Sequence, residues 1–426
     1  DGAPTLMTSG GDSQWWNPLQ YLEPDAVVNP LKINRFLGSY YGEIKLPLDG
    51  LKYRANIGID FHSRQDYSFL SSNARQGNPN QAKNATQQTY AYTFENLLFY
   101  DKQFGKHSIG ITLLQSIQRN RTESLSTTVQ DLPSDDLLFN DIASALDITG
   151  YDSNNQVWSL ASFMGRLNYN YKSRYYATFS MRYDGSSRFA KGNKWGFFPS
   201  VSLGWNIANE PFWENLKETV SMFKLRLSYG ALGNQNIGLY RYIPTLSYNT
   251  HALNYPFDGR ETSMGYAITA FPSSNIKWET TVYKNIGVDI SLWNNKLELS
   301  AEAYIKNTRD MLSSRNISLA TGYNSSILVN DGKLRTTGFE MQAIYHGKAG
   351  GLKYDLDLNL SHYKSVLKSM ANPDYLYEYG ALRTYVGGEI GEFWVYQTAG
   401  IFQNQAEVDE WNTAHGYKDQ NGNWQP

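Results

Sequence analysis

The sequence of 426 residues contains no cysteine. This absence excludes thiol catalysis, cysteine-ligated metal sites and a disulfide scaffold. It is compatible with an oxidising envelope compartment, where unpaired thiols are a hazard. No stretch of about 18 consecutive apolar residues occurs, so a transmembrane helix is not expected. Neither sign of charge predominates, because the chain has 38 basic and 40 acidic residues. We therefore expect no nucleic-acid partner, since nucleic-acid binders carry a basic surface.

Sequence signatures of catalysis are missing as well. There is no H-E-x-x-H, no G-x-S-x-G and no phosphate-binding loop, and Ser13 in the loop 11–14 has no nearby histidine. The six histidines are scattered without ligand spacing, so we expect no metal site and no cofactor. Asp355 and Asp357 share one face of an expected strand and could mimic a glycosidase carboxylate pair, but charges are routine on a polar face. We expect the protein not to be an enzyme.

Aromatic residues are abundant instead. Tyrosine (32), phenylalanine (19) and tryptophan (11) make up 15% of the chain, and residues of this kind favour β-strands. The mean hydropathy is nevertheless −0.51, which argues against a helical membrane protein. A membrane β-barrel agrees with both observations, because only alternate residues of each strand face lipid.

Long alternations of apolar and polar residues are the main positive signal. One run, 51–62, places six apolar residues on one face: Leu51, Tyr53, Ala55, Ile57, Ile59 and Phe61. The same period of two occurs in 223–229, 297–306 and 352–361. A period of two indicates strands, and runs of about ten residues match the 9–11 residues that a tilted strand needs to cross a bilayer. We expect about twelve strands between residues 36 and 366, with room for more around 382–402.

The connections between these strands alternate in length. Short turns are expected at 47–50, 103–106, 172–174, 294–296 and 347–351, and long polar loops at 65–87, 120–156, 236–275 and 313–332. A shorter link is expected near 190–194 and a brief helix near 209–221. Outer-membrane barrels have short periplasmic turns and long extracellular loops. The alternative is a soluble β-sandwich or propeller. Tyrosines near strand ends suit an interfacial girdle or a sandwich edge equally: Tyr169, Tyr171, Tyr175 and Tyr176.

Several motifs resemble the SusC/RagA family of TonB-linked outer-membrane proteins. They occur in the family's order over most of the chain: 161–171, 174–176, 182–189, 195–205, 224–230, 233–235, 278–279, 285–289, 337–340, 391–396 and 400–403. The most specific motif is formed by Asp184, Gly185, Ser186, Ser187, Arg188 and Phe189. This resemblance implies an all-β fold, an antiparallel transmembrane β-barrel in the outer membrane of a Bacteroidetes-type, Gram-negative bacterium.

The resemblance also implies a function and partners. Family members import nutrients, commonly oligosaccharides and sometimes peptides, with a SusD-like surface lipoprotein as a lid and TonB acting on a plug. Barrels of this kind have 22 strands, so about twelve cannot close the wall. We therefore expect residues 1–426 to be one barrel segment, with the plug domain and closing strands absent from it. The alternatives are a passive porin, a surface adhesin barrel or an extracellular glycan-active β-domain.

Two groups of residues are candidates for functional roles. Trp15, Trp16, Tyr240 and Tyr242 could stack on sugar rings, although packing within loops or anchoring at the membrane interface is the favoured explanation. The motif 184–189 is expected to be structural. Its Gly and Ser residues would permit a close backbone approach where a strand leaves the membrane, and Asp184 and Arg188 could bind neighbouring groups inside the barrel.

Overall fold

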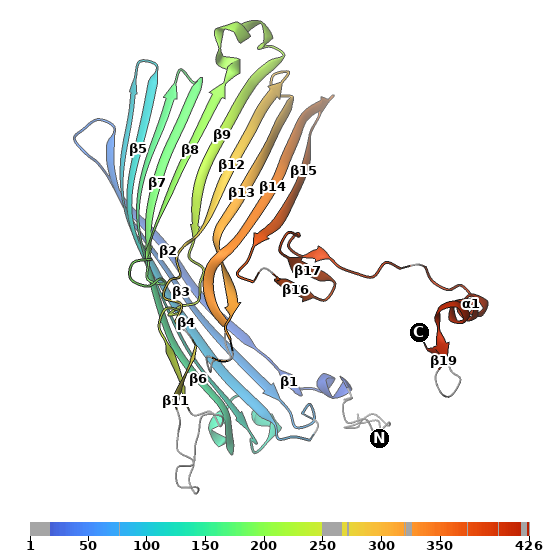
Figure 1. Cartoon of the computed structure of the whole chain (residues 1–426). Helices are drawn as coiled ribbons and strands as arrows, with labels where there is room; N and C mark the ends of the chain where they lie inside the picture. The colour runs from blue at the N-terminus through green and yellow to red at the C-terminus, as the bar shows by residue number, and fades with distance from the viewer. Residues whose placement is uncertain are drawn as a thin grey trace.

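The protein is mainly one curved antiparallel sheet, seen in a computed structural model that describes residues 18–75, 77–248, 266–270, 272–318, 320, 326–372, 374–398, 400–418 and 424–425 (Figure 1). Among these residues twelve long strands form the wall. They are β2 (Leu31–Lys45), β3 (Leu51–Leu70), β4 (Gln81–Phe104), β5 (His107–Gln130), β6 (Asp147–Tyr171), β7 (Tyr175–Ser186), β8 (Trp195–Asn206), β9 (Val220–Asn234), β12 (Glu279–Leu292), β13 (Leu297–Asn316), β14 (Ser326–Ala349) and β15 (Leu352–Ser369). The number of strands agrees with the sequence-based expectation, and the all-β class is confirmed.

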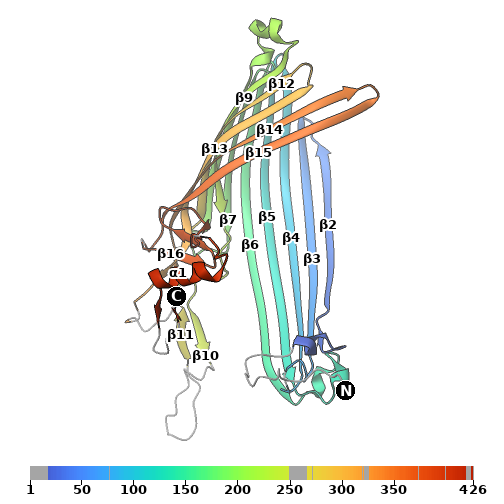
Figure 2. The same cartoon turned by 90° about the vertical axis from the view of Figure 1, so that its right-hand side faces the viewer.

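Each long strand pairs with the next long strand along the chain, so the wall is an up-and-down sheet. The short strand β1 (Val27–Val28) pairs with the far end of β3. Within the described residues β2 and β15 do not pair with each other, and Figure 2 shows the sheet open between them. None of the described helices has the length and apolar character that crossing a membrane requires.

The pairing register shows which residues of neighbouring strands share a face of the wall. Ile57 of β3 is paired with Tyr40 of β2 and with Phe94 of β4, and Phe94 is paired with Ile117 of β5. Directly paired residues lie on the same face of a sheet, so these side chains form one apolar face. We call this face the apolar row. On every long strand it comprises the alternate residues whose side chains point to the same side of the sheet as those of Leu51, Tyr53, Ala55, Ile57, Ile59 and Phe61 of β3. The intervening positions are the polar row.

The apolar row is exposed rather than covered by a second layer. Ile57, Phe94, Ile117 and Leu227 retain 46%, 40%, 45% and 51% of their accessible surface. Soluble monomers rarely expose contiguous apolar patches of more than a few hundred Å². An exposed apolar face of this extent is stable in contact with lipid. A soluble sandwich would bury one face of each sheet, so it does not describe this chain.

Aromatic residues of the apolar row gather at the end of the wall that carries the short turns. Tyr171 and Tyr175 stack at 6.4 Å between ring centroids, and Tyr175 stacks on Trp205 at the same distance. Tyr169 lies in the same row on β6. The girdle prediction is wrong for Tyr176, which lies in the polar row with Lys224 Nζ 4.9 Å from its ring centroid. Adjacent residues of a strand point to opposite faces, so Tyr175 and Tyr176 cannot both face lipid.

The opposite end of the wall carries the longer connections. The link between β9 and β12, residues 235–278, has the length expected from the loop at 236–275, whereas the other three are shorter than expected. Strand β3 continues to Leu70 and β4 begins at Gln81, so much of the expected loop 65–87 is strand. The expected loops 120–156 and 313–332 are shortened in the same way. Outside the membrane both faces of a strand meet water, so the alternation of apolar and polar residues disappears while the backbone ladder continues.

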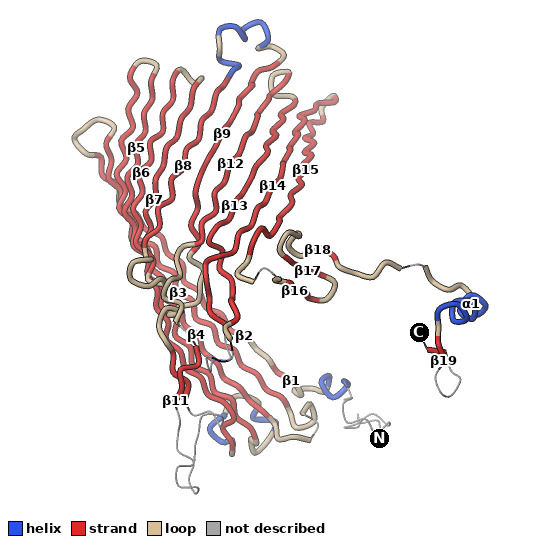
Figure 3. The backbone as a smooth tube through the Cα atoms, in the orientation of Figure 1, coloured by secondary structure: helices blue, strands red, loops and turns tan. Residues whose placement is uncertain are grey.

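Smaller elements complete the described chain (Figure 3). The brief helix expected near 209–221 consists of two 3-10 turns, η4 (Ile207–Asn209) and η5 (Pro211–Leu216). Residues around 382–402 add no further long strand to the wall among the described residues, and they meet its edge at a bridge between Glu389 and Val366 of β15. They belong in part to a separate three-stranded sheet. The remaining elements are η1 (Pro18–Leu22), η2 (Asp135–Leu137), η3 (Ile142–Ser144), β10 (Thr245–Tyr248), β11 (Tyr266–Ala270), β16 (Leu376–Tyr379), β17 (Leu382–Tyr385), β18 (Glu392–Phe393), α1 (Gln405–His415), β19 (Tyr417–Lys418) and β20 (Trp424–Gln425).

Candidate functional site

The motif 184–189 begins at the loop end of β7 with a buried carboxylate. Asp184 is 7% exposed, and both of its carboxylate oxygens lie 2.8 Å from Arg182 Nε, whose single N–H is shared between them. The Nη2 of the same guanidinium donates to Ser162 Oγ at 2.9 Å. Asp184, Arg182 and Ser162 all lie in the polar row, so this group joins β6 to β7 on that face. A buried carboxylate is tolerated here because a cation is hydrogen-bonded to it.

Gly185 allows an aromatic ring to lie against the backbone. A Cβ atom at this position would come within 2.7 Å of three atoms of the Trp195 indole. Trp195 is paired with Gly185 across β7 and β8 and stacks on Tyr183 at 4.7 Å, nearly parallel at 13°. Phe163 lies next to it at 6.3 Å. The close approach expected in this motif is thus that of a ring in the apolar row, at the loop end of the wall.

The two serines fix the chain as it leaves the strand. Ser186 is 1% exposed, and its Oγ accepts a hydrogen bond of 3.1 Å from the backbone N–H of Arg188. Ser187 Oγ accepts one of 2.8 Å from the backbone N–H of Ser159 on β6. The hydroxyls therefore satisfy backbone donors beyond the last ladder pair of β7, and both roles are structural.

Arg188 and Phe189 connect the motif to the long segment between β9 and β12. Arg188 Nη1 donates to the carbonyl oxygen of Ile237 at 2.7 Å, and its guanidinium lies 4.8 Å from the ring centroid of Trp158. Burial lowers the pKa of Arg188 from its ordinary value. Phe189 is 1% exposed and packs 5.2 Å from Trp278. Arg188 and Asp184 have different partners, so the two charges do not act as a pair.

Phe189 belongs to a small hydrophobic cluster, which we call the loop-end core. Its members come from the β7–β8 link, from β8 and from the segment 235–278: Phe189, Phe198, Ile237, Ile276 and Trp278. The Trp278 indole N–H donates to the carbonyl oxygen of Lys194 at 2.9 Å, so its polar edge is satisfied as well. The loop-end core holds three stretches of chain together just where the strands emerge.

The aromatic candidates for sugar stacking divide into two groups. Trp15 and Trp16 lie outside the described residues. Tyr240 is 40% exposed, and its hydroxyl bridges the backbone N–H and carbonyl of Val157 at 3.0 and 3.2 Å. Tyr242 lies two residues further along the same segment and is partly buried. The Tyr240 hydroxyl therefore has a packing role, and a sugar-binding role for these residues stays a prediction.

A charged network that the sequence did not reveal lies in the polar row of β9, β12 and β13. Arg226 contacts Asp289 at 2.8 Å and Glu302 at 3.5 Å. Ser300 donates to Asp289 Oδ1 at 2.9 Å. The only sequence signal was the polar position of Arg226 between Leu225 and Leu227, which predicts its face but not its partners.

Further charged pairs follow the polar row around the wall. Arg35 of β2 forms a bidentate pair with Asp60 of β3 at 2.8 and 2.9 Å. Asp355 accepts a hydrogen bond of 2.7 Å from His346 Nδ1, and Asp357 accepts one of 3.3 Å from Gln342. Asp355 and Asp357 therefore have separate partners within the wall. The polar row therefore carries paired charges on β2 and β3 as well as on β9, β12 and β13.

Glu210 fastens the short-turn end of the wall. Its carboxylate accepts hydrogen bonds from Tyr175 Oη at 2.6 Å, Trp205 Nε1 at 3.1 Å and Arg174 Nη1 at 3.2 Å. These donors, the Tyr175 hydroxyl foremost, hold the pKa of Glu210 below its usual range. Glu210 lies between η4 and η5, so it ties the β8–β9 connection to the β6–β7 turn.

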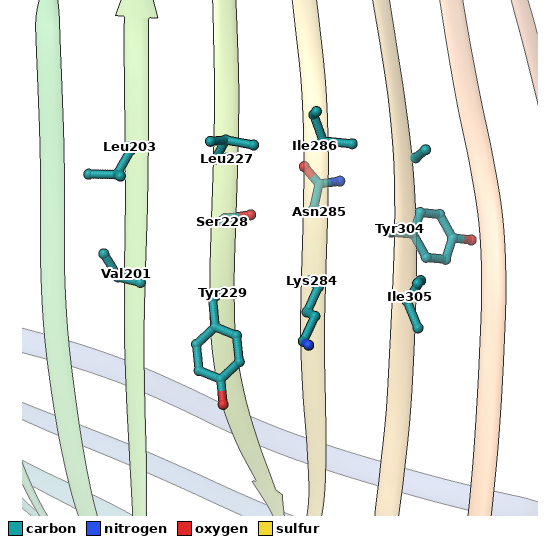
Figure 4. A pocket seen from close by; sticks show the side chains of 11 residues that line it. Val201, Leu203, Leu227, Ser228, Tyr229, Lys284, Asn285, Ile286, Tyr304 and Ile305 are labelled. Carbon is teal, nitrogen blue, oxygen red and sulfur yellow. The ribbon is translucent and has the colours of Figure 1, made fainter.

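An apolar depression on the wall lies outside this polar surface. It lies on the apolar row across β8, β9, β12 and β13, and its side chains include Leu203, Leu227, Ile286 and Ile305 (Figure 4). It is a groove open to the surroundings, and the titratable residues that line it are Tyr229, Lys284 and Tyr304. Over the described residues, no cluster of three or more His, Cys, Asp or Glu side chains could hold a metal ion.

Comparison with known proteins agrees with a membrane wall of this kind. The family described as "TonB dependent receptor-like, beta-barrel" matches residues 4–425. The chain is 28% identical to TonB-dependent receptor P3 of Formosa agariphila over 99% of its length, covering 42% of that protein. It is 33% identical to the TonB-dependent receptor SusC of Bacteroides thetaiotaomicron over 76% of its length, covering 32% of SusC.

A solved structure shows the same fold. The RagAB peptide transporter superimposes with a TM-score of 0.77 at 20% identity, over 89% of this chain and 41% of that one. The chain thus spans less than half the length of these relatives. The family match and the relative SusC confirm the resemblance to the SusC/RagA family. An open wall with a lipid-facing apolar row and a polar row toward the lumen is part of an outer-membrane barrel, and the chain belongs to the family of TonB-dependent receptor-like β-barrels.

Proposed function

We propose that the complete protein imports a nutrient across the outer membrane, and that this chain supplies part of its transport wall. The observation that carries the proposal is the polar row, whose charges are paired along the wall, as Arg226 is with Asp289 and Arg35 with Asp60. Paired charges leave the surface hydrated without a strong net field, which suits passage of a large polar solute. The family match supports import that depends on TonB.

The proposed solute is an oligosaccharide, with a peptide as the second candidate. Sugars present hydroxyl groups and apolar ring faces, and the loop end of the wall offers both hydrogen-bonding groups and the rings of Tyr240 and Tyr242. The RagAB structures are described as a peptide transporter, which supports the second candidate. We propose that Trp15 and Trp16 take part in the same contacts.

The proposed mechanism needs parts beyond residues 1–426, which we assign to one barrel segment. A plug that fills the lumen would be moved by TonB, and a SusD-like surface lipoprotein would cover the loop end. The strands β3 to β6 are 20 to 25 residues long. Because about 9–11 residues span the bilayer, roughly half of each strand stands outside it, which provides a rigid collar for a lid.

The proposal is tested by uptake in a strain that lacks the complete protein. We expect the strain to lose growth on particular oligosaccharides as the sole carbon source and to regain it with the restored gene. Removing TonB function should abolish uptake equally. Uptake that persists without TonB would contradict import by this mechanism and support a passive porin. A surface adhesin would change attachment and leave uptake intact.

The lid and the solute class are tested separately. Affinity purification of the complete protein from detergent extract should recover a surface lipoprotein in equal amount. Loss of growth on peptides with normal growth on oligosaccharides would show that the solute is a peptide. Recovery of the barrel without any lipoprotein would contradict the proposed lid.

A further inference from the structure

The lipid-facing apolar row ends in cations at its loop end on three adjacent strands. Lys284 of β12 follows Ile286 in the row, Arg309 of β13 follows Asn307, and Arg335 of β14 is paired with Asn307. All three side chains are exposed. We call these three residues the cationic rim.

The three cations lie close together. Arg335 and Val282 are both paired with Asn307, and Lys284 and Arg309 lie two residues from these positions along their strands. With about 4.8 Å between strands and about 3.4 Å per residue, the three Cα atoms fit within roughly 15 Å. One phosphorylated headgroup can reach such a set with its oxygens.

No carboxylate neutralises the cationic rim. Among the described residues, none of Lys284, Arg309 and Arg335 takes part in an ion pair, and Arg335 Nε donates only to the amide oxygen of Asn307 at 2.8 Å. The nearest acid along the chain, Asp310, is paired with Lys277 at 3.0 Å. Lys364 on β15 is paired with Glu389 at 2.7 Å, so we leave it out of the rim.

An apolar groove leads into the rim from the membrane side. Its walls are Val201, Leu203, Leu227, Ile286 and Ile305, and Tyr229 and Lys284 stand at its loop end, as Figure 4 shows. Tyr229 and Lys284 are directly paired across β9 and β12. Ala303, which is paired with Ile286, has a small side chain and therefore leaves the groove open at this position. An acyl chain in the groove would therefore end beside an amine.

The other end of the same strands has no such charges. The apolar row finishes there with Leu292 on β12, Leu297 on β13 and, beyond Tyr345, Gly347 and Ala349 on β14. A cation that merely reached out of the membrane toward water would serve equally well at either end. Its restriction to the loop end indicates negative charge in the outer leaflet only.

We propose that the cationic rim and the groove below it bind a phosphorylated, acylated glycolipid of the outer leaflet. The guanidinium groups of Arg309 and Arg335 suit bidentate contacts to phosphate oxygens, and the groove takes an acyl chain along Leu227, Ile286 and Ile305. Bound lipid would fix the loop end of β12 to β14 and seal the wall laterally. This site is on the opposite face from the transport path and does not depend on the solute imported.

The site is tested with the complete protein, purified in a neutral detergent and stripped of lipid. A phosphorylated lipid A is added, and protein–lipid complexes are counted by mass spectrometry of the intact assembly. We expect the triple variant Lys284→Gln, Arg309→Gln, Arg335→Gln to bind at least tenfold more weakly than the unaltered protein. The matched control removes three cations from the polar row, Lys52→Gln, Lys224→Gln and Lys306→Gln, and should bind normally.

Further arms separate the possible outcomes. Lipid A treated with phosphatase should bind weakly, and millimolar inorganic phosphate should not displace the intact lipid, because the groove also contributes. Equal binding of the phosphatase-treated lipid, or displacement by inorganic phosphate, would overturn the assignment. A triple variant that exchanges lysine and arginine at the same positions keeps the charges but loses the bidentate contacts of Arg309 and Arg335, so it should bind more tightly than the glutamine variant and more weakly than the unaltered protein. Normal binding by the glutamine variant would also refute the site.

Discussion

A methyl group at Gly233 tests the packing of the loop-end core. The Cβ atom of an alanine there would lie 2.1 Å from Phe198 Cζ, far inside van der Waals contact. The Phe198 ring is 7% exposed and lies 5.3 Å from Trp278. On another side, a Cβ at Gly196 would meet the same ring at 2.5 Å, so the ring fills a slot between two glycines.

Overpacking of this kind costs about 1–3 kcal/mol. Gly233→Ala should therefore lower the thermal midpoint of unfolding of the complete protein in detergent, measured by tryptophan fluorescence. The matched control is Gly42→Ala in β2, where nothing lies within 4 Å of the new Cβ. Alanine in a strand is favoured over glycine by about 0.5–1 kcal/mol, so the control should be neutral or slightly stabilising.

A second substitution identifies the cause. Phe198→Leu removes the Cζ atom that the new methyl group would meet, so the cost of Gly233→Ala should fall in the Phe198→Leu background. The two changes would then be less destabilising together than the sum of the separate effects. Strict additivity, or a Gly233→Ala variant as stable as the Gly42→Ala control, would refute the packing argument.

Three further predictions concern contacts outside the membrane. The pKa of Glu210 is lowered in the folded protein, so its stabilising effect is complete above its ordinary value of 4.5 and is lost as pH falls through the folded-state pKa. Glu210→Gln should therefore reduce the thermal midpoint at pH 7 and flatten its fall on acidification, and an unchanged acid profile would argue against this role. Tyr240→Phe removes two hydrogen bonds to Val157 and should cost about 0.5–1.5 kcal/mol, measured as faster hydrogen exchange in 155–159, whereas unchanged exchange there would contradict it. Arg188→Gln takes the guanidinium from the Ile237 carbonyl and should speed exchange in 235–244 with little effect on β2 and β3. Equal acceleration in both regions would indicate general unfolding.

The faces of the strands were predictable from sequence, since the period of two is preserved wherever one face meets lipid. In 51–62 each apolar residue lies in the row assigned to it, and paired strands repeat the pattern. The strand ends were not predictable. Leu70 and Gln81 bound a loop much shorter than expected because the ladder continues where the pattern has stopped.

The partners of individual side chains could not be predicted from the sequence either. Arg226 and Asp289 are 63 residues apart, and only the register of β9 on β12 brings them together. The indole over Gly185 comes from Trp195 across the β7–β8 link. A motif can thus identify a family and a strand end, while the contacts that explain it depend on pairing between distant residues.

The central claim is that alternate residues of each long strand face lipid and lumen. The absence of cysteine from the chain allows single cysteines to be placed at successive positions of 56–61 and labelled with nitroxide in bilayers. We expect labels at 57, 59 and 61 to be relaxed by oxygen, which partitions into lipid, and labels at 56, 58 and 60 by a water-soluble nickel complex. Accessibility without this period of two, or equal access of the nickel complex at all six positions, would contradict a membrane-spanning wall.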